Sequence, residues 1–351
     1  MIRVLVVDDS SFMRSAISRT LTASGQFEVV GQAKDGRDAV KRVAELSPDV
    51  VSMDFNMPGM NGVEAIREIM AAKPTPIVMF SAHTAEGAQE TLDALAAGAV
   101  DFLTKPAGEV SADLSKVQEE LKRKLTAAAS ARMLAARPAR PRATPIGKAA
   151  PPSGSRGVAV TPTATSVLAR LCVIGISTGG PAALSRILPD FPSDTRFGIV
   201  VVQHMPAHFT RALADRLDGM CALSVREAEA GDRPRPGLAL IAPGDRHLEF
   251  DAKGAIVLTD GPPVHGCRPA VDLAMLSAAR VYRQRTIGVV MTGMGKDGAA
   301  GALAIRAAEG RTFAQDEATS AIFGMPRAAI DAGAIEEVVP LDGIPARLRY
   351  V

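Results

Sequence analysis

A glycine-rich turn around Ser177 is the segment of this chain best suited to chemistry. The turn reads Gly-Ile-Ser-Thr-Gly-Gly over 175–180 and follows an apolar run at 171–174. A strand that ends in glycine, turns on a serine and continues as a helix exposes the hydroxyl beside backbone N–H groups. Ser177 is therefore a candidate nucleophile. The same turn also suits phosphate or dinucleotide binding, or close packing alone.

A nucleophilic serine needs a base, and usually a carboxylate that orients the base. His204 and Asp297 are the candidates, because each follows an apolar run that predicts a strand, as Ser177 does. A metal site formed by His204 and His208 is disfavoured, since Pro206 interrupts the helix that their spacing would need. From spacing alone, Asp297 could equally be the N-cap of a helix over 298–309.

A second group of polar residues follows strands in the N-terminal third: Asp8, Asp9, Asp54, Ser81 and Lys105. The carboxyl ends of parallel strands share one edge of a sheet, so we expect these residues to converge. Three carboxylates in one pocket need a cation, and oxygen ligands favour Mg²⁺. Asp54 would then carry a phosphoryl group as an acyl phosphate. Taken singly, each residue could be an ordinary helix cap or a surface charge.

Short β-branched runs alternate with helical patterns in both halves of the chain, which predicts parallel sheets covered by helices. We expect an α/β protein with an N-terminal doubly wound five-stranded domain and a C-terminal domain with a mainly parallel sheet. The predicted strands are 4–7, 29–31, 50–53, 77–80 and 100–103, then 171–174, 198–202, 238–242, 255–259 and 286–292. Helices are predicted from 180 and over 209–217, 270–282 and 298–309.

A change of composition separates the two domains. The segment 125–166 is rich in Ala, Pro and Arg, and no Asp or Glu occurs between Lys122 and Pro189. Such a segment cannot bury a core and predicts a tether between domains at 1–124 and 167–351. Its positive charge could attract an acidic surface or nucleic acid, but it lacks the interleaved aromatic residues of nucleic-acid-binding segments.

Composition restricts the class of protein. The chain has 351 residues, 47% hydrophobic and 22% charged, with a net charge of +2, as in globular proteins without a nucleic-acid partner. No signal peptide or membrane-spanning run is present, so we expect a cytoplasmic protein without direct membrane insertion. Three scattered cysteines, Cys172, Cys221 and Cys267, predict free thiols, and Cys267 has polar neighbours.

The N-terminal domain resembles the receiver domains of two-component response regulators, and the run Asp-Phe-Asn-Met-Pro-Gly-Met-Asn-Gly at 54–62 adds specificity. The resemblance implies a phosphohistidine on a histidine kinase as phosphoryl donor. It also implies these roles: Asp54 as phosphoacceptor; Asp8, Asp9, Asp54 and the Asn56 carbonyl as Mg²⁺ ligands; Ser81, Phe102 and Lys105 as switch residues.

The order of the candidate catalytic residues separates the C-terminal domain from the α/β-hydrolases, which run Ser, acid, His. Here the order is Ser, His, Asp. The domain resembles instead the catalytic domain of the chemotaxis protein-glutamate methylesterases, the CheB family. The motifs that carry this resemblance are Gly-Ile-Ser-Thr-Gly-Gly-Pro at 175–181, Gln-His-Met-Pro at 203–206, Ala-Pro-Gly-Asp-Arg-His at 242–247, Arg-Pro-Ala-Val-Asp at 268–272 and Thr-Gly-Met-Gly-Lys-Asp-Gly at 292–298.

This resemblance implies a triad of Ser177, His204 and Asp297, with the backbone N–H groups of Thr178 and Met294 as the oxyanion hole. It implies hydrolysis of glutamate γ-methyl esters, and deamidation of glutamines, on the cytoplasmic helices of methyl-accepting chemotaxis receptors, without a cofactor for the esterase. Two positions depart from the family pattern: Lys296 replaces Asn and Cys267 replaces a histidine. We expect neither departure to touch the triad.

The resemblance further implies that the unphosphorylated receiver covers the esterase cleft and that phosphorylation of Asp54 relieves this. Three alternatives remain open. The first is an esterase or amidase of this fold that acts on another protein. The second is a signalling adaptor whose 175–180 turn binds a nucleotide or phosphate, although the lysine and hydroxyl residue of a P-loop are missing. The third is a DNA-binding regulator, for which no basic output domain is found.

Overall fold

A computed structural model describes residues 1–81, 84–104, 113–131 and 170–351 of the chain. Lys105 and the whole of 132–169, which includes most of the expected tether, lie outside the described residues. The expected domain boundary at 124 falls inside a helix that continues to Ala129. None of the described helices is both long and apolar enough to cross a membrane.

The N-terminal domain is a five-stranded parallel sheet with strand order β2-β1-β3-β4-β5. Its strands are β1 (Ile2–Val7), β2 (Phe27–Ala33), β3 (Val50–Asp54), β4 (Ile77–Ser81) and β5 (Asp101–Thr104). Its helices are α1 (Ser11–Ala23), α2 (Gly36–Leu46), α3 (Gly62–Ala72), α4 (Ala85–Ala97) and α5 (Asp113–Ala129).

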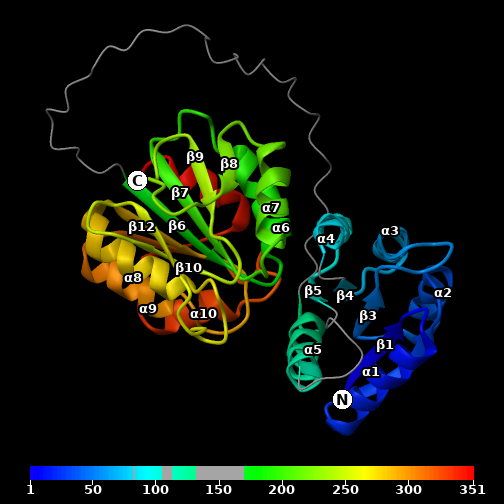
Figure 1. The fold of residues 1–351 in the computed structure, drawn as a ribbon. Coiled ribbons are helices and arrows are strands. Elements are labelled where there is room, and N and C mark those ends of the chain that lie inside the picture. The colour runs from blue at the N-terminus through cyan, green and yellow to red at the C-terminus, as the bar shows by residue number, and fades with distance from the viewer. Residues whose placement is uncertain (82–83, 105–112, 132–169) are drawn as a thin grey trace, which may run out of the picture.

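Helices cover both faces of this sheet (Figure 1). Buried residues of α2, α3 and α4 join one apolar cluster, and buried residues of α1 and α5 join another. All five residues of β3 and of β4 are buried, as expected for central strands of a parallel sheet. The predicted doubly wound fold is therefore confirmed.

The C-terminal domain is built on a seven-stranded parallel sheet with strand order β14-β13-β12-β6-β7-β9-β8. Its strands are β6 (Arg170–Ile176), β7 (Phe197–Gln203), β8 (Ser224–Glu227), β9 (Leu238–Ile241), β12 (Thr286–Val290), β13 (Arg311–Gln315) and β14 (Glu337–Val339). A separate antiparallel hairpin is formed by β10 (His247–Phe250) and β11 (Ile256–Thr259).

Helices again lie on both faces of the sheet, because α6 and α7 contribute to one apolar cluster and α8, α9 and α10 to the other. The helices are α6 (Gly180–Ile187), α7 (Phe209–Asp218), α8 (Val271–Tyr282), α9 (Ala299–Ala307), α10 (Gly324–Asp331) and α11 (Ile344–Leu348). Short 3₁₀ turns occupy 188–190, 283–285 and 341–343. The predicted α/β class with a mainly parallel sheet is confirmed for this domain too.

Sequence patterns were less informative at the margins of the second sheet. The run predicted as a strand over 255–259 forms one arm of the hairpin and not a strand of the main sheet. β8, β10, β13 and β14 were not predicted. β8 and β14 are edge strands with exposed positions, so their sequences lack a continuous apolar run. β13 is an internal strand, but polar residues interrupt its apolar pattern. Strand β12 was predicted. It pairs with β6, the strand that ends directly before Ser177.

The two domains are in contact. Helix α4 of the first domain packs against α7 and α6 of the second. One cluster of buried apolar side chains includes residues from both domains. At the boundary the rings of Phe102 and Phe209 stack with centroids 4.7 Å apart, and Arg216 pairs with Asp93 at 2.5 Å. The contact therefore combines an apolar centre with a charged pair.

Candidate active site and phosphorylation site

Ser177 directly follows β6, and cross-strand bonds hold its backbone. Its N–H donates to the carbonyl of Thr292 at 2.9 Å, and its own carbonyl accepts the N–H of Gly180 at 2.8 Å. Gly179 has a φ of 77°, in the left-handed region that favours glycine. A Cβ on Gly293 would lie 2.7 Å from the Cβ of Ser177, so only glycine allows this close approach. The glycines of the two motifs therefore fix the serine's position.

His204 follows β7, beside Ser177. Ile176 and Gln203 are partners in the β6–β7 ladder, so the next residue on each strand is placed at the same sheet edge. The Gln203 side chain donates to the carbonyls of Ser177 at 3.0 Å and His204 at 3.2 Å. Gln203 thus ties the two candidate catalytic residues together. The sequence motif at 203–206 by itself predicts no role for Gln203.

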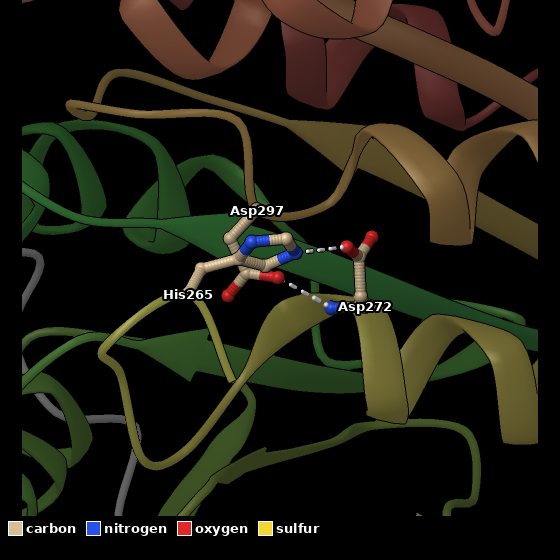
Figure 2. A group of neighbouring side chains, drawn as sticks. All are labelled: His265, Asp272 and Asp297. Carbon is tan, nitrogen blue, oxygen red and sulfur yellow. Dashed lines mark hydrogen bonds and ion pairs between the residues drawn. The ribbon is translucent and has the colours of Figure 1, made fainter. Parts of the chain in front are cut away.

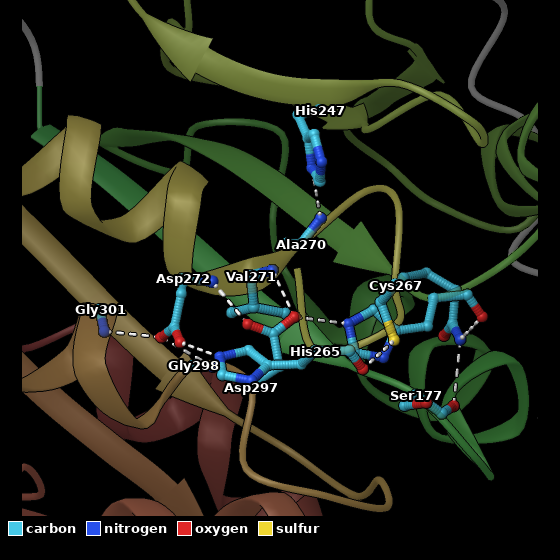
Figure 3. Close-up of polar contacts among 12 residues, drawn as sticks. Ser177, His247, His265, Cys267, Ala270, Val271, Asp272, Asp297, Gly298 and Gly301 are labelled. Atoms are coloured by element: carbon cyan, nitrogen blue, oxygen red, sulfur yellow. Dashed lines mark hydrogen bonds and ion pairs between the residues drawn. The ribbon is translucent and has the colours of Figure 1, made fainter. Parts of the chain in front are cut away.

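Asp297 pairs with His204. Its carboxylate lies 2.8 Å from Nε2 of His204, and the two side chains are only 2% and 10% exposed. The carboxylate also accepts the backbone N–H groups of Val271 at 2.7 Å and Asp272 at 2.8 Å, as Figure 3 shows. These groups belong to the first turn of α8, where the helix dipole favours an anion. Asp297 therefore caps α8.

The alternative reading of Asp297 as a cap of the helix that follows it is wrong. The N-cap of α9 is Gly298, which makes no side-chain cap bond. Asp272 takes that role, because its carboxylate accepts the N–H groups of Gly298 at 3.0 Å and Gly301 at 2.7 Å. Each aspartate thus caps the helix that begins beside the other. Sequence alone could not show this exchange, because a cap is normally local.

His265 completes a second histidine–aspartate pair in the same place. Its Nε2 lies 2.9 Å from the carboxylate of Asp272, as Figure 2 shows. Ligand atoms of His265, Asp272 and Asp297 lie within 4.8 Å of one another. The carboxylate oxygens are already engaged by helix N–H groups and by the two histidines. The cluster therefore supports the orientation of Asp297.

The electrostatics of the pair favour a positive imidazole. Burial lowers the pKa of His204, but hydrogen bonds with Asp297 and Cys267, and the charges of those groups, raise it to about 9. Burial raises the pKa of Asp297, yet the bond to His204, its charge and the two α8 N–H groups bring it below its ordinary value. A site that stabilises an imidazolium suits a base that must accept a proton from serine.

Cys267 contributes to the raised pKa of His204, which places it in the neighbourhood of the proposed triad. Its sulfur donates to the carbonyl of His265 at 3.8 Å. That this departure from the family pattern leaves the triad intact stays a prediction. Lys296, the other departure, makes no hydrogen bond from its side chain to any described residue.

In the described part of the chain, the Ser177 hydroxyl makes no hydrogen bond to His204. Because Nε2 faces Asp297, the other ring nitrogen, Nδ1, is the one left for a proton from serine. The backbone N–H groups of Thr178 and Met294 donate to no acceptor within the described residues. The N–H of Ser177 is already engaged by Thr292. Free N–H groups beside a serine are the feature that an oxyanion hole requires.

The carboxylates of the first domain also converge. Asp8, Asp9 and Asp54 offer ligand oxygens within 4.8 Å of one another. Asp8 and Asp54 are buried, at 1% and 3% exposed. The cap of α1 is Ser10, which accepts the N–H of Met13 at 3.4 Å, so neither Asp8 nor Asp9 is needed for that cap. Buried carboxylates this close fit a divalent cation held by oxygen ligands.

The remaining predicted residues of this site take different positions. Asn56 lies in the exposed loop after β3. The Ser81 hydroxyl faces α4, where it bonds the carbonyl of Gly87 at 3.0 Å and the hydroxyl of Thr91 at 2.5 Å. Phe102 is 5% exposed and occupies the domain boundary. Lys105 lies outside the described residues.

The first domain touches the Ser177 turn itself. The Thr178 hydroxyl donates to Asp101 at 2.6 Å, and the Gly179 N–H donates to the carbonyl of Val100 at 3.2 Å. The second oxygen of Asp101 pairs with Lys124 of α5 at 2.9 Å. Asp101 was not singled out in the sequence, because an acid at the start of a strand has no distinctive signal. It links the first domain to the residue next to the candidate nucleophile.

The fold and the two sites define a class of protein: a receiver domain joined to an α/β hydrolytic domain with serine, histidine and aspartate at the edge of its sheet. Comparison with known proteins agrees. Residues 4–114 match the family model of the response regulator receiver domain, and residues 172–348 match that of the CheB methylesterase.

Relatives match over nearly the whole chain. A protein-glutamate methylesterase/protein-glutamine glutaminase of Symbiobacterium thermophilum is 48% identical over 98% of this chain and 95% of its own length. One of Thermotoga maritima is 43% identical over 99% and 97%. The crystal structure of the Thermotoga maritima CheB methylesterase catalytic domain, 43% identical, covers 52% of this chain and 99% of its own, with a TM-score of 0.51. The chain belongs to the CheB methylesterase family and is a methylesterase that carries its own receiver domain.

Proposed function

We propose that this chain removes methyl groups from glutamate γ-methyl esters, and deamidates glutamines, on the cytoplasmic helices of methyl-accepting chemotaxis receptors. The names of the relatives supply the two reactions. The observation that carries the proposal is the buried His204–Asp297 pair beside Ser177 at the ends of adjacent strands. The chain's place of action would be the cytoplasm, where these receptor helices lie.

Ser177 would act as nucleophile. Its oxygen attacks the γ-carbonyl carbon of the ester while its proton passes to Nδ1 of His204. The imidazolium then gives that proton to the departing methoxide, which leaves as methanol, and an acyl-enzyme remains. Water, losing a proton to His204, attacks the acyl carbon and releases glutamate and the serine. A glutamine follows the same course with ammonia as the leaving group.

The neighbouring groups would stabilise the charges that form. The N–H groups of Thr178 and Met294, which donate to no acceptor in the described part of the chain, are suited to the oxyanion of each tetrahedral intermediate. Asp297, held by two N–H groups of α8, keeps the Nε2 side of His204 fixed and stabilises the imidazolium. No cofactor is needed for this reaction.

Asp54 would accept a phosphoryl group from a phosphohistidine of a chemotaxis histidine kinase. The close buried oxygens of Asp8, Asp9 and Asp54 fit Mg²⁺, and the Asn56 carbonyl would complete the protein's ligands. A bound Mg²⁺ would neutralise the phosphoryl oxygens during transfer. Ser81 and Lys105 would bind those oxygens once the acyl phosphate has formed.

Phosphorylation would act through the domain contact. Ser81 now bonds two groups of α4, and α4 packs on the catalytic domain. If the Ser81 hydroxyl turns to bind the phosphoryl group, it loses its two hydrogen bonds to α4. Phe102, next to Asp101 in the chain, stacks on Phe209 at the same domain boundary. Phosphorylation activates only as far as it favours the separated arrangement over the one seen here.

Methanol release from methylated receptor helices tests the proposal. Wild type, Ser177→Ala and Asp54→Asn are compared with and without a small acyl-phosphate donor. We expect Ser177→Ala to lose the reaction, and Asp54→Asn to lose only the response to the donor. Wild-type release by Ser177→Ala would refute the triad. An unchanged donor response in Asp54→Asn would refute the phosphoacceptor assignment.

A further inference from the structure

Gln203 is a buried residue whose side-chain amide is held against the turn that carries Ser177. It is the last residue of β7, pairs with Ile176 of β6 and is only 2% exposed. Its amide nitrogen donates to the carbonyls of Ser177 at 3.0 Å and His204 at 3.2 Å. Both partners are acceptors, so the nitrogen and not the oxygen must face them. A Cβ on Gly180 would lie 2.0 Å from the amide oxygen, so glycine leaves the room that this side chain needs.

The other end of the amide adds nothing to stability. The Gln203 amide oxygen is buried and has no hydrogen-bond partner among the described residues. A buried acceptor without a partner is unfavourable, because it has lost its water and gained nothing in return. The benefit of a glutamine at this position must therefore come from the two hydrogen bonds that its nitrogen donates.

The backbone groups of Ser177 and Thr178 are engaged with one exception. The Ser177 N–H donates to the Thr292 carbonyl at 2.9 Å, and the Thr178 carbonyl accepts the Thr292 hydroxyl at 2.9 Å. The Ser177 carbonyl accepts the Gln203 amide and also the Gly180 N–H, the latter at 2.8 Å. Within the described ranges, the Thr178 N–H alone among these groups has no acceptor. It is the N–H group that the proposed function places in the oxyanion hole.

The direction of this N–H follows from the geometry of the peptide group. The Ser177 carbonyl and the Thr178 N–H belong to the same peptide group, and its peptide bond is trans. In a planar trans peptide the C=O and N–H bonds point in opposite directions. A group that holds the carbonyl toward the buried Gln203 amide therefore directs the N–H to the other side, where the described residues offer it no acceptor.

We propose that Gln203 is a positioning residue that holds the Ser177–Thr178 peptide with its N–H directed at the oxyanion. The inference rests on the proposed function, because that reaction supplies the oxyanion. Gln203 acts on the carbonyl end of the peptide and thereby on the N–H end, and its second hydrogen bond keeps the backbone of His204 in place beside the turn. Among the described residues the Gly180 N–H is the other group that holds this carbonyl. Without Gln203, one hydrogen bond instead of two opposes rotation of the peptide.

Replacement of Gln203 by methionine tests the inference in the full-length protein. Gln203→Met keeps the length of the side chain and removes both donated hydrogen bonds. Complete loss of an oxyanion donor costs about 10² to 10³ in kcat, and the Gly180 bond remains, so we expect a fall of about ten- to a hundredfold. KM should change by less than about threefold, because the ester carbonyl carries no full negative charge in the ground state. Methanol release from methylated receptor helices, with an acyl-phosphate donor present, gives both constants.

Gln315→Met is the matched control. Gln315 is also a buried glutamine at the end of a strand, β13, and its amide bonds the Thr292 N–H at 2.9 Å and the Thr319 carbonyl at 2.7 Å. In the described part of the chain it makes no hydrogen bond to the Ser177–Thr178 peptide. We expect this variant to lower the thermal midpoint and to retain most of the wild-type kcat. Equal losses of kcat in the two variants would overturn the inference, because removal of any buried amide would then explain both.

A crystal structure of Gln203→Met separates the inference from the proposed function. We expect the Ser177 carbonyl to be rotated from its wild-type direction or to occupy two orientations. The wild-type orientation alone would overturn the inference, whatever the activity. A rotated peptide with wild-type kcat would instead refute the oxyanion role of Thr178, on which the inference rests. If Gln203→Met does not fold, Gln203→Glu provides the same test, because its carboxylate fills the same space and cannot donate.

Discussion

The proposed phosphorylation site and the proposed triad both lie at the carboxyl ends of parallel strands, but their carboxylates are in different environments. Asp297 accepts two backbone N–H groups of α8 and pairs with His204. Asp8 and Asp54 are buried within reach of Asp9, and three carboxyl groups gather there. The first carboxylate has an imidazole partner before substrate arrives, whereas the second arrangement brings three carboxylates close together and suits a divalent cation. The proposed triad is suited to holding a fixed geometry, whereas the proposed phosphorylation site is suited to a change of charge.

The domain contact joins these two kinds of site. Asp101 and Val100 of the first domain bind the turn that follows Ser177, and Phe102 stacks on Phe209. These contacts are the route by which the proposed phosphorylation of Asp54 would act on the catalytic domain without altering the His204–Asp297 pair. The following variants test this division, from the largest expected effect to the smallest.

Asp297→Asn should cost the most, because the amide cannot stabilise the imidazolium and favours the wrong tautomer of His204. We expect kcat for methanol release to fall by about 10³ to 10⁴. The thermal midpoint should be measured alongside, since loss of a cap at α8 costs only about 1 kcal/mol. A fall of less than tenfold in folded protein would show that the pair is not part of the catalytic machinery.

Asp54→Asn should remove the response to phosphorylation and leave the proposed triad intact. Without a phosphoryl group, the balance between the contacting and separated domains no longer responds to the donor. We expect the ratio of rates with and without acyl phosphate to become one, measured by methanol release. As a control, a fragment that starts at residue 170 should release methanol at a rate that does not depend on the donor, because it keeps the proposed triad and lacks the receiver domain.

Asp101→Ala should raise the rate without phosphodonor, because it removes the bond to Thr178. One such bond contributes about 1 to 2 kcal/mol, so we expect an increase of about five- to thirtyfold. Thr178→Val should act alike while keeping the backbone N–H, and the double variant should gain little more. Glu119→Ala is the matched control, since Glu119 pairs with Lys122 on the same helix and makes no hydrogen bond or ion pair with the catalytic domain among the described residues. Additive gains would show that Asp101 and Thr178 act separately.

Cys267→Ala should give the smallest effect, a shift in pH dependence. Its hydrogen bond and charge raise the pKa of His204, so the variant should have a lower one. Because the free base is needed, the acidic limb of kcat/KM should move to lower pH, and the variant should lose less activity below that limb. The full pH profile of kcat/KM measures this. A limb that moves upward would show that the thiol does not support the imidazolium.

The sequence by itself determined the two α/β domains, because alternating β-branched runs and helical patterns need no distant partner to be recognised. It also placed serine, histidine and the carboxylates after strands, and the parallel topology brought Asp8, Asp9 and Asp54 together as predicted. It missed the edge strands β8 and β14, whose half-polar sequences resemble loops, and the internal strand β13, whose apolar run is interrupted by polar residues.

Tertiary structure alone decided the long-range choices. Asp297 caps α8, Asp272 caps α9, and Asp101 binds Thr178. Each of these contacts joins segments that are far apart in the chain, and each is made by a residue type whose usual partner is local or solvent. Short-range sequence patterns favour no one of these distant partners over another. Only the packing of the whole chain decides which partner each residue contacts.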